Sequence, residues 1–232
     1  MTPSSASSAT TPEEPGLDSC ISVLQLPVCA DAADMPAAAV AAGIEALSTA
    51  LRDPDIRVIV LGLHAQPAAA GNAAHAHPDA LHDWLLALWE SDKPTVAALN
   101  APIAGTGLAL AMACDMLVAG RDVRMHLPPR LQLAGRSPAA TWLAWQRLPR
   151  AEATALALGR ELDAPRAHAL GLVLDLTAPG LALEGALDVA RRIAAEPGDV
   201  LGGVRQRLAA CSTQDLSRVL VDERERWLRG RA

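Results

Sequence analysis

The stretch from Lys93 to Gly120 reads KPTVAALNAPIAGTGLALAMACDMLVAG, and it decides the expected fold. Thr95 to Leu99 is a short apolar run, which predicts a buried strand. Asn100 to Gly107 contains one proline and two glycines and predicts a loop with at least one positive φ. Leu108 to Cys114, rich in alanine, leucine and methionine, predicts a helix, and Met116 to Ala119 predicts a further strand.

A strand followed by a glycine loop and a helix start predicts a site for negative charge. Unpaired backbone N–H groups and the positive end of the helix dipole meet there, so an anion or a developing oxyanion is stabilised. A membrane span is disfavoured because Asn100, Pro102 and the glycines interrupt the uncharged run. A dinucleotide fingerprint would need a third glycine where Leu110 stands, and a P-loop would need Gly-Lys-Ser/Thr. The alternative interpretation, a buried strand-to-helix turn that binds no ligand, remains open.

Composition narrows the class of protein. A chain of 232 residues is long enough for one domain with a large core. Half of the residues are hydrophobic, yet phenylalanine and tyrosine are absent, so alanine and leucine must fill that core. The net charge of −6 argues against nucleic-acid binding.

The cysteines and the N-terminus predict the location of the protein. Four cysteines lie far apart without a C-x-x-C pair, which indicates reduced thiols in a cytoplasmic protein and no zinc framework. Residues 1–18 are rich in serine, threonine and proline, without lysine or arginine, and predict a disordered tail before a domain at 19–232.

The order of elements predicts an α/β fold. Ile21 to Val28 predicts a strand, Pro36 to Arg52 a helix with apolar residues at +4, +3, +4, and Arg57 to Leu63 a strand buried on both faces. Strand, helix, strand implies a parallel sheet with right-handed crossovers. Gly171 predicts a helix C-cap. Further helices are predicted at Leu81–Glu90, Ala139–Leu148, Ala151–Leu158, Ala164–Leu170, Leu181–Ala195, Gly203–Ala210 and Leu216–Leu228, and strands at Val123–Leu127 and Leu172–Leu176.

A second loop, His64 to His77, also follows a buried strand. Ligands of open α/β sheets bind at the carboxyl ends of strands. The loop that contains Ala70, Gly71 and Asn72 and the loop at 105–107 could each offer a backbone N–H to one oxygen, as in an oxyanion hole. His75 and His77 have no third ligand nearby, so a solvated loop is expected instead of a metal site.

An ordered set of motifs resembles the enoyl-CoA hydratase/isomerase (crotonase) superfamily, over most of the chain from about residue 20. The motifs are Asp53–Leu61 (DPDIRVIVL), Ala70-Gly71, Lys93–Asn100 (KPTVAALN), Gly105-Thr106-Gly107, Ala111–Asp115 (AMACD), Gly159 and Ala164–Val173 (APRAHALGLV). The resemblance implies a crotonase-like ββα superhelix over about 19–150 and a helical part over 151–232. It also implies a homotrimer or a dimer of trimers.

The resemblance further implies that an acyl-CoA thioester is bound and its carbonyl polarised by two backbone N–H groups, those of Ala70 and Thr106. Coenzyme A would enter as part of the substrate, with no separate cofactor. Gly71, Gly105, Gly107 and Arg130 are then expected to contact the acyl-CoA. An oxyanion hole of this kind suits an enolate-like oxyanion, because fixed donors favour the charged state over the ground state.

Two departures from the family argue against standard hydration. The two catalytic glutamates of the hydratases match Ala109 and Pro129 here. Hydration needs a carboxylate to activate water and an acid to protonate the α-carbon, and neither residue can serve. Asn72 and His126 are candidates to replace them. Each also has a structural interpretation: Asn72 as a helix N-cap and His126 as a packed histidine.

Charged residues near the matched glutamate positions also allow two interpretations. Arg130, Arg136, Arg147 and Arg150 could form a basic patch for the CoA phosphates or a solvated face. Asp115 is expected to fix local structure, because family members of differing activity carry an acid there.

Three hypotheses follow. The first is an acyl-CoA-binding enzyme of the lyase or isomerase type that does not catalyse standard hydration. The second is an inactive binding or scaffold subunit with the same fold. The third is an unrelated α/β protein whose glycine loop only turns the chain.

Overall fold

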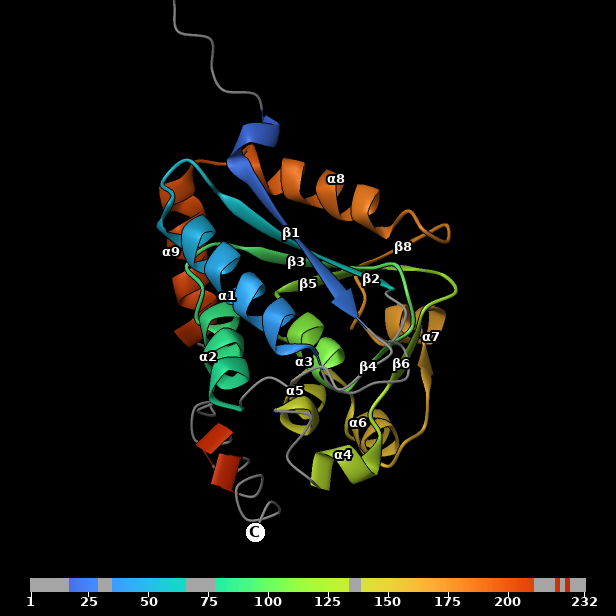
Figure 1. The fold of residues 1–232 in the computed structure, drawn as a ribbon. Coiled ribbons are helices and arrows are strands. Elements are labelled where there is room, and N and C mark those ends of the chain that lie inside the picture. Colours follow the sequence, from blue (N-terminus) through green and yellow to red (C-terminus); the bar gives the residue numbers. More distant parts are fainter. Residues whose placement is uncertain are drawn as a thin grey trace, which may run out of the picture.

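A five-stranded parallel sheet with the strand order β1-β2-β3-β5-β8 forms the centre of the computed structural model (Figure 1). Residues 17–28, 35–65, 78–133, 139–210, 220–221 and 224–225 are described. The strands are β1 (Ile21–Val28), β2 (Val58–Ala65), β3 (Thr95–Leu99), β5 (Met116–Gly120) and β8 (Asp175–Thr177). Parallel neighbours require crossover connections, and each of these contains at least one helix in its described part.

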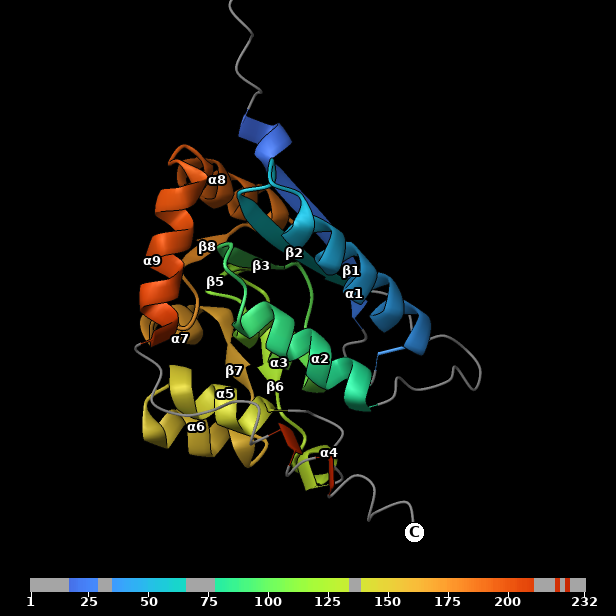
Figure 2. The same cartoon turned by 90° about the vertical axis from the view of Figure 1, so that its left-hand side faces the viewer.

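Strand alternation sends side chains of the sheet into two separate cores. Val58 and Val60 of β2 face α8 (Ala182–Ala194), whose alanines allow the helix to lie close to the sheet. Ile59, Leu61 and Leu63 of the same strand face the larger core on the other side. Figures 1 and 2 show α8 on one face and α1 (Ala37–Arg52), α2 (Pro78–Trp89) and α3 (Gly105–Ala113) on the other.

A second, three-stranded sheet lies on the side of the molecule away from α8 (Figure 2). It consists of β4 (Ile103–Ala104), β6 (Arg124–His126) and β7 (Leu162–Asp163), with β4 parallel and β7 antiparallel to β6. The other elements are η1 (Leu17–Cys20), α4 (Pro129–Leu133), α5 (Ala140–Arg147), α6 (Arg150–Ala157), α7 (Ala164–Ala169) and α9 (Gly198–Ala210).

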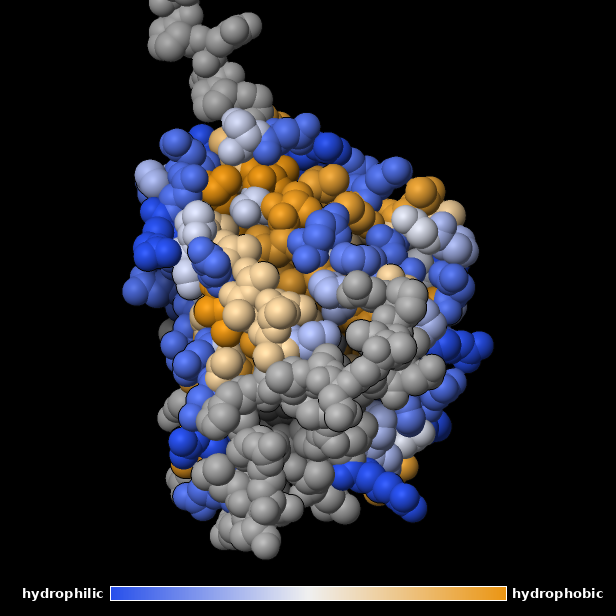
Figure 3. All heavy atoms as spheres, in the orientation of Figure 1, coloured by the Kyte–Doolittle hydropathy of each residue, from blue (hydrophilic) through white to orange (hydrophobic). Residues whose placement is uncertain are grey.

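The edge strand β1 and the helix α1 leave apolar atoms on the surface, which Figure 3 shows on this face of the molecule. Val23 of β1 is 40% exposed, and Ala38, Ala41 and Ala42 of α1 face outward. No helix in the described part of the chain is long and apolar enough to cross a membrane.

The predicted elements before residue 100 are confirmed to within three residues at each end, and two strands match their predicted bounds, while several later boundaries were wrong. The loop expected over Asn100–Gly107 contains β4, and the helix begins at Gly105 instead of Leu108. The strand expected at Leu172–Leu176 is Asp175–Thr177, because the N–H groups of Leu172 and Val173 bond back to Ala167 at the end of α7. Gly171 has a φ of 80° directly after α7, as its predicted role requires.

Three other predictions differ or fall partly outside the described residues. α9 begins at Gly198 instead of Gly203, and β7 was not predicted. Residues 17 and 18 of the expected tail belong to η1, and residues 1–16 lie outside the described part. Of the expected Leu216–Leu228 helix, only 220–221 and 224–225 are described, and they are helical.

Candidate functional site

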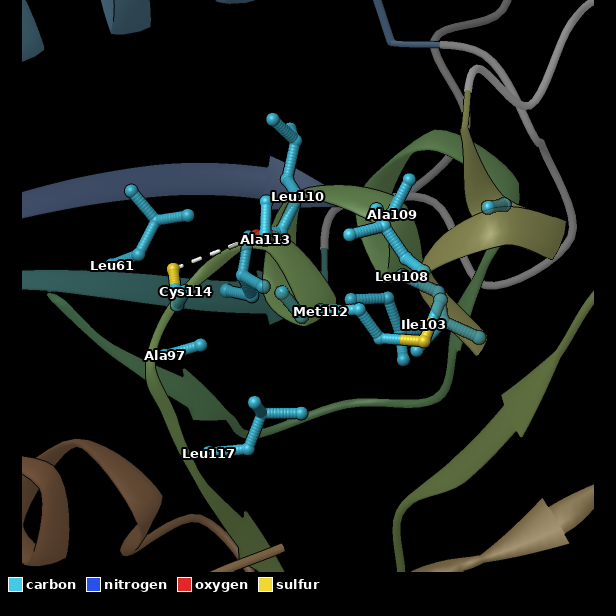
Figure 4. Close-up of a cluster of buried hydrophobic side chains, with 14 of the residues drawn as sticks. Leu61, Ala97, Ile103, Leu108, Ala109, Leu110, Met112, Ala113, Cys114 and Leu117 are labelled. Atoms are coloured by element: carbon cyan, nitrogen blue, oxygen red, sulfur yellow. Dashed lines mark hydrogen bonds between the residues drawn. The ribbon is translucent and has the colours of Figure 1, made fainter. Parts of the chain in front are cut away.

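The helix α3 lies wholly inside the protein. All nine of its residues are buried, and alanine, leucine and methionine make up most of them. Figure 4 shows its side chains among Leu61, Ala97 and Leu117, which come from three strands of the large sheet. The helix is therefore apolar on every side, as expected of a helix without an exposed face.

The start of α3 brings together the glycines that the sequence predicted. Gly105 has a φ of 51°, which glycine adopts without steric cost, and it turns the chain from β4 directly into the helix. Thr106 follows with no exposed surface. The residue before the helix, Ala104, has no side-chain acceptor, so it cannot cap the first N–H groups. The positive end of the helix dipole lies at this point.

The carboxyl ends of two strands lie beside this helix start. A Cβ at Gly107 would lie 3.1 Å from Cγ1 of Val28, so α3 approaches the end of β1 closely at this glycine. Val28 in turn pairs with Ala65, the last residue of β2. Ala70, Gly71 and Asn72 follow β2 in the chain and lie outside the described residues.

His126 lies on the strand next to this turn. It is the last residue of β6 and pairs in parallel register with Ala104 of β4. Its side chain is half-buried, and its Nε2 would lie 3.9 Å from a Cβ at Gly159. The same Cβ would lie 3.1 Å from Cδ of Pro129. The structure thus places His126, Pro129 and Gly159 at one corner.

The two positions that match the hydratase glutamates differ in exposure. Ala109 is buried in α3, three residues after Thr106 and hence on a neighbouring part of the helix surface. Pro129 begins α4 and is exposed. Neither side chain can accept or donate a proton, so any acid–base chemistry here must come from other groups.

The basic patch suggested for CoA phosphates does not include Arg147. Its guanidinium donates to the carbonyl oxygens of Met112 (2.7 Å), Cys114 and Asp115 (2.6 Å), at the end of α3. Burial lowers the pKa of Arg147. The positive charge complements the negative end of the helix dipole, which the sequence did not reveal.

The other arginines of that patch have separate environments. Arg150 lies over the ring of Trp145, 5.3 Å from its centroid, and Arg130 is exposed on α4. Arg136 lies outside the described residues.

Asp115 fixes local structure, as predicted. Its carboxylate accepts hydrogen bonds from the backbone N–H (2.9 Å) and hydroxyl (3.0 Å) of Thr95, and it forms an ion pair with Arg205 at 2.9 Å. Arg205, only 7% exposed, also donates to the carbonyl oxygen of Trp89. These bonds join β3, the residue before β5, α2 and α9, and none of them involves the start of α3.

The candidate site at the start of α3 has neither a reactive thiol nor a metal-binding group among the described residues. Cys20 and Cys114 are buried free thiols, and burial raises the pKa of Cys114 to about 12. Within the described ranges, no three side chains of histidine, cysteine, aspartate or glutamate are grouped to hold a metal ion.

Comparisons with known proteins agree with this architecture. The sequence profile described as enoyl-CoA hydratase/isomerase matches residues 35–227. The 2,3-dehydroadipyl-CoA hydratase of Escherichia coli (strain K12) is 33% identical over 196 residues, which cover 78% of this chain and 75% of the relative. The 1,2-epoxyphenylacetyl-CoA isomerase of the same organism is 31% identical over 136 residues, 57% of this chain and 51% of that protein.

A solved structure shares the fold. The structure of a probable enoyl-CoA hydratase from Mycobacterium thermoresistibile superposes with a TM-score of 0.73 and 20% identity, and the match covers 92% of this chain and 93% of the other. The predicted crotonase-like fold is confirmed by this likeness. Together with the profile match, which spans most of the chain, it identifies the protein as a member of the enoyl-CoA hydratase/isomerase family.

Proposed function

We propose that the protein binds an acyl-CoA thioester and stabilises its enolate form at the start of α3. The carbonyl oxygen would accept hydrogen bonds from the backbone N–H groups of Thr106 and Ala70. The observation that carries this proposal is the turn at Gly105, which enters a buried helix without a side-chain cap. Two relatives named for CoA thioesters support the class of substrate.

The described strand ends favour a contribution from the second loop. Ala65 leads into the segment with Ala70, Gly71 and Asn72, and it pairs with Val28, which adjoins Gly107. We infer that this segment supplies the second donor and that Asn72 hydrogen-bonds the acyl group. Gly71, Gly105 and Gly107 would then let the backbone approach the thioester closely.

The reaction we propose is of the lyase or isomerase type and is not standard hydration. Ala109 and Pro129 stand where hydration would need carboxylates, and neither can activate water. The exposed guanidinium of Arg130 would bind a phosphate of the CoA part. The free thiols of Cys20 and Cys114 are consistent with a cytoplasmic protein, and the family resemblance favours a homotrimer or a dimer of trimers.

The same two positions favour a second candidate function. A protein that lacks both carboxylates could keep the fold as a catalytically inactive binding or scaffold subunit. This candidate predicts that no thioester is turned over.

Calorimetric titration tests the proposal with a matched pair of ligands. Butyryl-CoA carries the thioester carbonyl, whereas S-butyl-CoA has the same chain length and no carbonyl oxygen. Two hydrogen bonds to that oxygen should favour butyryl-CoA about tenfold, which corresponds to about 1.4 kcal/mol. Equal affinity for both ligands, or no binding of either at millimolar concentration, would contradict the proposal.

Variants at position 106 test whether the preference for butyryl-CoA depends on the backbone N–H of Thr106. Thr106→Pro removes one backbone N–H in the first turn of a helix, where proline is tolerated. Thr106→Ser keeps the N–H and the hydroxyl and serves as the control. The preference for butyryl-CoA should disappear in the first variant and persist in the second, with circular dichroism to establish that both are folded.

A further inference from the structure

The corner beside the start of α3 contains one side chain suited to proton transfer. His126 pairs with Ala104, so its backbone lies one strand spacing, about 4.8 Å, from the residue that precedes Gly105. Its ring is half-buried, and a half-buried ring keeps a route to solvent for protons. The backbone of His126 therefore adjoins the turn into α3, where the thioester oxygen would be bound.

Gly159 leaves space beside this imidazole. With a φ of 93°, it occupies a conformation that other residues rarely adopt, and a Cβ there would lie near both Cδ of Pro129 and Nε2 of His126. The ring of Pro129 offers no proton acceptor. Nε2 therefore faces a corner formed by an apolar ring and a residue without a side chain.

The charged groups on β6, α4 and β7 do not offer an alternative base. Arg124 on β6 and Arg130 on α4 are exposed, and a guanidinium has donors but no acceptor for a proton. Arg160, after Gly159, pairs with Glu152. The carboxylate of Asp163 on β7 caps α7 by accepting from the N–H of Arg166 at 2.7 Å.

His126 is the one histidine among the residues of β4, β6, β7, α3 and α4, and histidine is the side chain that most often transfers protons in enzymes. No acid from α3 or α4 competes with it, since those helices contain none.

Resting on the function proposed above, we propose that His126 takes a proton from the α-carbon of the bound acyl thioester and returns it. The α C–H bond breaks, and its electron pair forms a double bond between the α-carbon and the carbonyl carbon. The carbonyl π pair moves onto the oxygen at the start of α3, and the proton is held on a ring nitrogen of His126. Return of the proton reverses these changes, so no oxidant, reductant or second substrate is needed.

Deuterium exchange measures this step without knowledge of the physiological reaction. Butyryl-CoA is incubated with the protein in D2O, and incorporation at the α-carbon is followed by mass spectrometry. The unmodified protein should catalyse incorporation. His126→Gln, which keeps a polar side chain but cannot take up the proton, should lower the rate at least about 100-fold, as expected for loss of an acid–base group.

Two further variants separate chemistry from folding. His126→Gly should regain part of the exchange rate when free imidazole is added, which a merely structural role would not produce. His168→Gln changes another histidine, whose Nδ1 contacts the carbonyl oxygen of Val173 at 3.0 Å, and should exchange at the unmodified rate.

The outcomes distinguish this proposal from the one on which it rests. If the unmodified protein prefers butyryl-CoA to S-butyl-CoA but catalyses no exchange, the role of His126 is refuted while the oxyanion site stands. Exchange by His126→Gln at the unmodified rate refutes it as well. Equal binding of the two ligands refutes the proposed function itself.

Discussion

Replacing Asp115 by asparagine is expected to lower the free energy of unfolding by about 3 kcal/mol, because it leaves the charge of Arg205 inside the protein without its partner. The carboxylate receives two hydrogen bonds from Thr95 and an ion pair from Arg205 at 2.9 Å. The Arg205 side chain is 9% exposed and that of Asp115 is 24% exposed.

The magnitude follows from this burial. Breaking a buried ion pair by removing one partner costs about 3–5 kcal/mol. The partial exposure of Asp115 lets water solvate the remaining charge, which places the expected value at the lower end. With a urea slope of about 2 kcal/mol per molar, the midpoint of unfolding should shift by about 1.5 M.

Urea unfolding followed by tryptophan fluorescence is the assay, since the chain contains five tryptophans. Asp175→Asn is the control, because Asp175 pairs with Arg192 at 3.6 Å with both side chains more than half exposed. That change should cost less than about 0.5 kcal/mol. If Asp115→Asn lowers the midpoint no more than Asp175→Asn does, the structural role of Asp115 is refuted.

Three more predictions concern α3 and the glycines. Arg147→Met should lower the free energy of unfolding by about 2–3 kcal/mol, because charged hydrogen bonds to three carbonyls are lost; the same urea assay measures it. Gly171→Ala should lower the free energy of unfolding by about 1 kcal/mol, because φ is 80° there, whereas Gly203→Ala inside α9 should raise it by about 0.5–1 kcal/mol. Neither new Cβ meets an atom within 4 Å, so the two changes differ only in backbone conformation. Thermal unfolding that shifts in the same direction for both variants would contradict the argument. Cys114, whose thiol pKa burial raises from 9.0 to about 12, should resist iodoacetamide in the folded protein at about pH 9 and react after unfolding, as mapped by peptide mass spectrometry. Because the folded state holds this proton more tightly, stability should fall as pH rises from 9.0 through about 12, and Cys114→Ala should remove that fall.

The sequence predicted elements whose pattern is local and continuous. Val58 to Leu63 is uniformly apolar because both faces of β2 are covered, and this property is visible in the run itself. The helix α1 was predicted from the spacing of its apolar residues at +4, +3, +4, two of which are buried. Gly105 and Gly107 were found because glycine marks positive φ and close approach, both of which occur here.

Features that depend on distant partners were not predictable in this way. β7 is a strand of two residues that exists because it pairs with β6, about 40 positions earlier in the chain, as their register gives. Arg147 and Arg205 look like surface charges in the sequence, and their partners lie 32 or more positions away. At the candidate site, the neighbourhood of His126 and Gly159 depends on a contact between separate segments.

The complete burial of α3 also has a consequence for motion. A helix without an exposed face has no direction in which it can tilt without opening the core around it. Its amides should therefore exchange with solvent deuterium only as fast as the whole domain unfolds. The backbone at Thr106 would then keep its orientation for as long as the fold itself lasts.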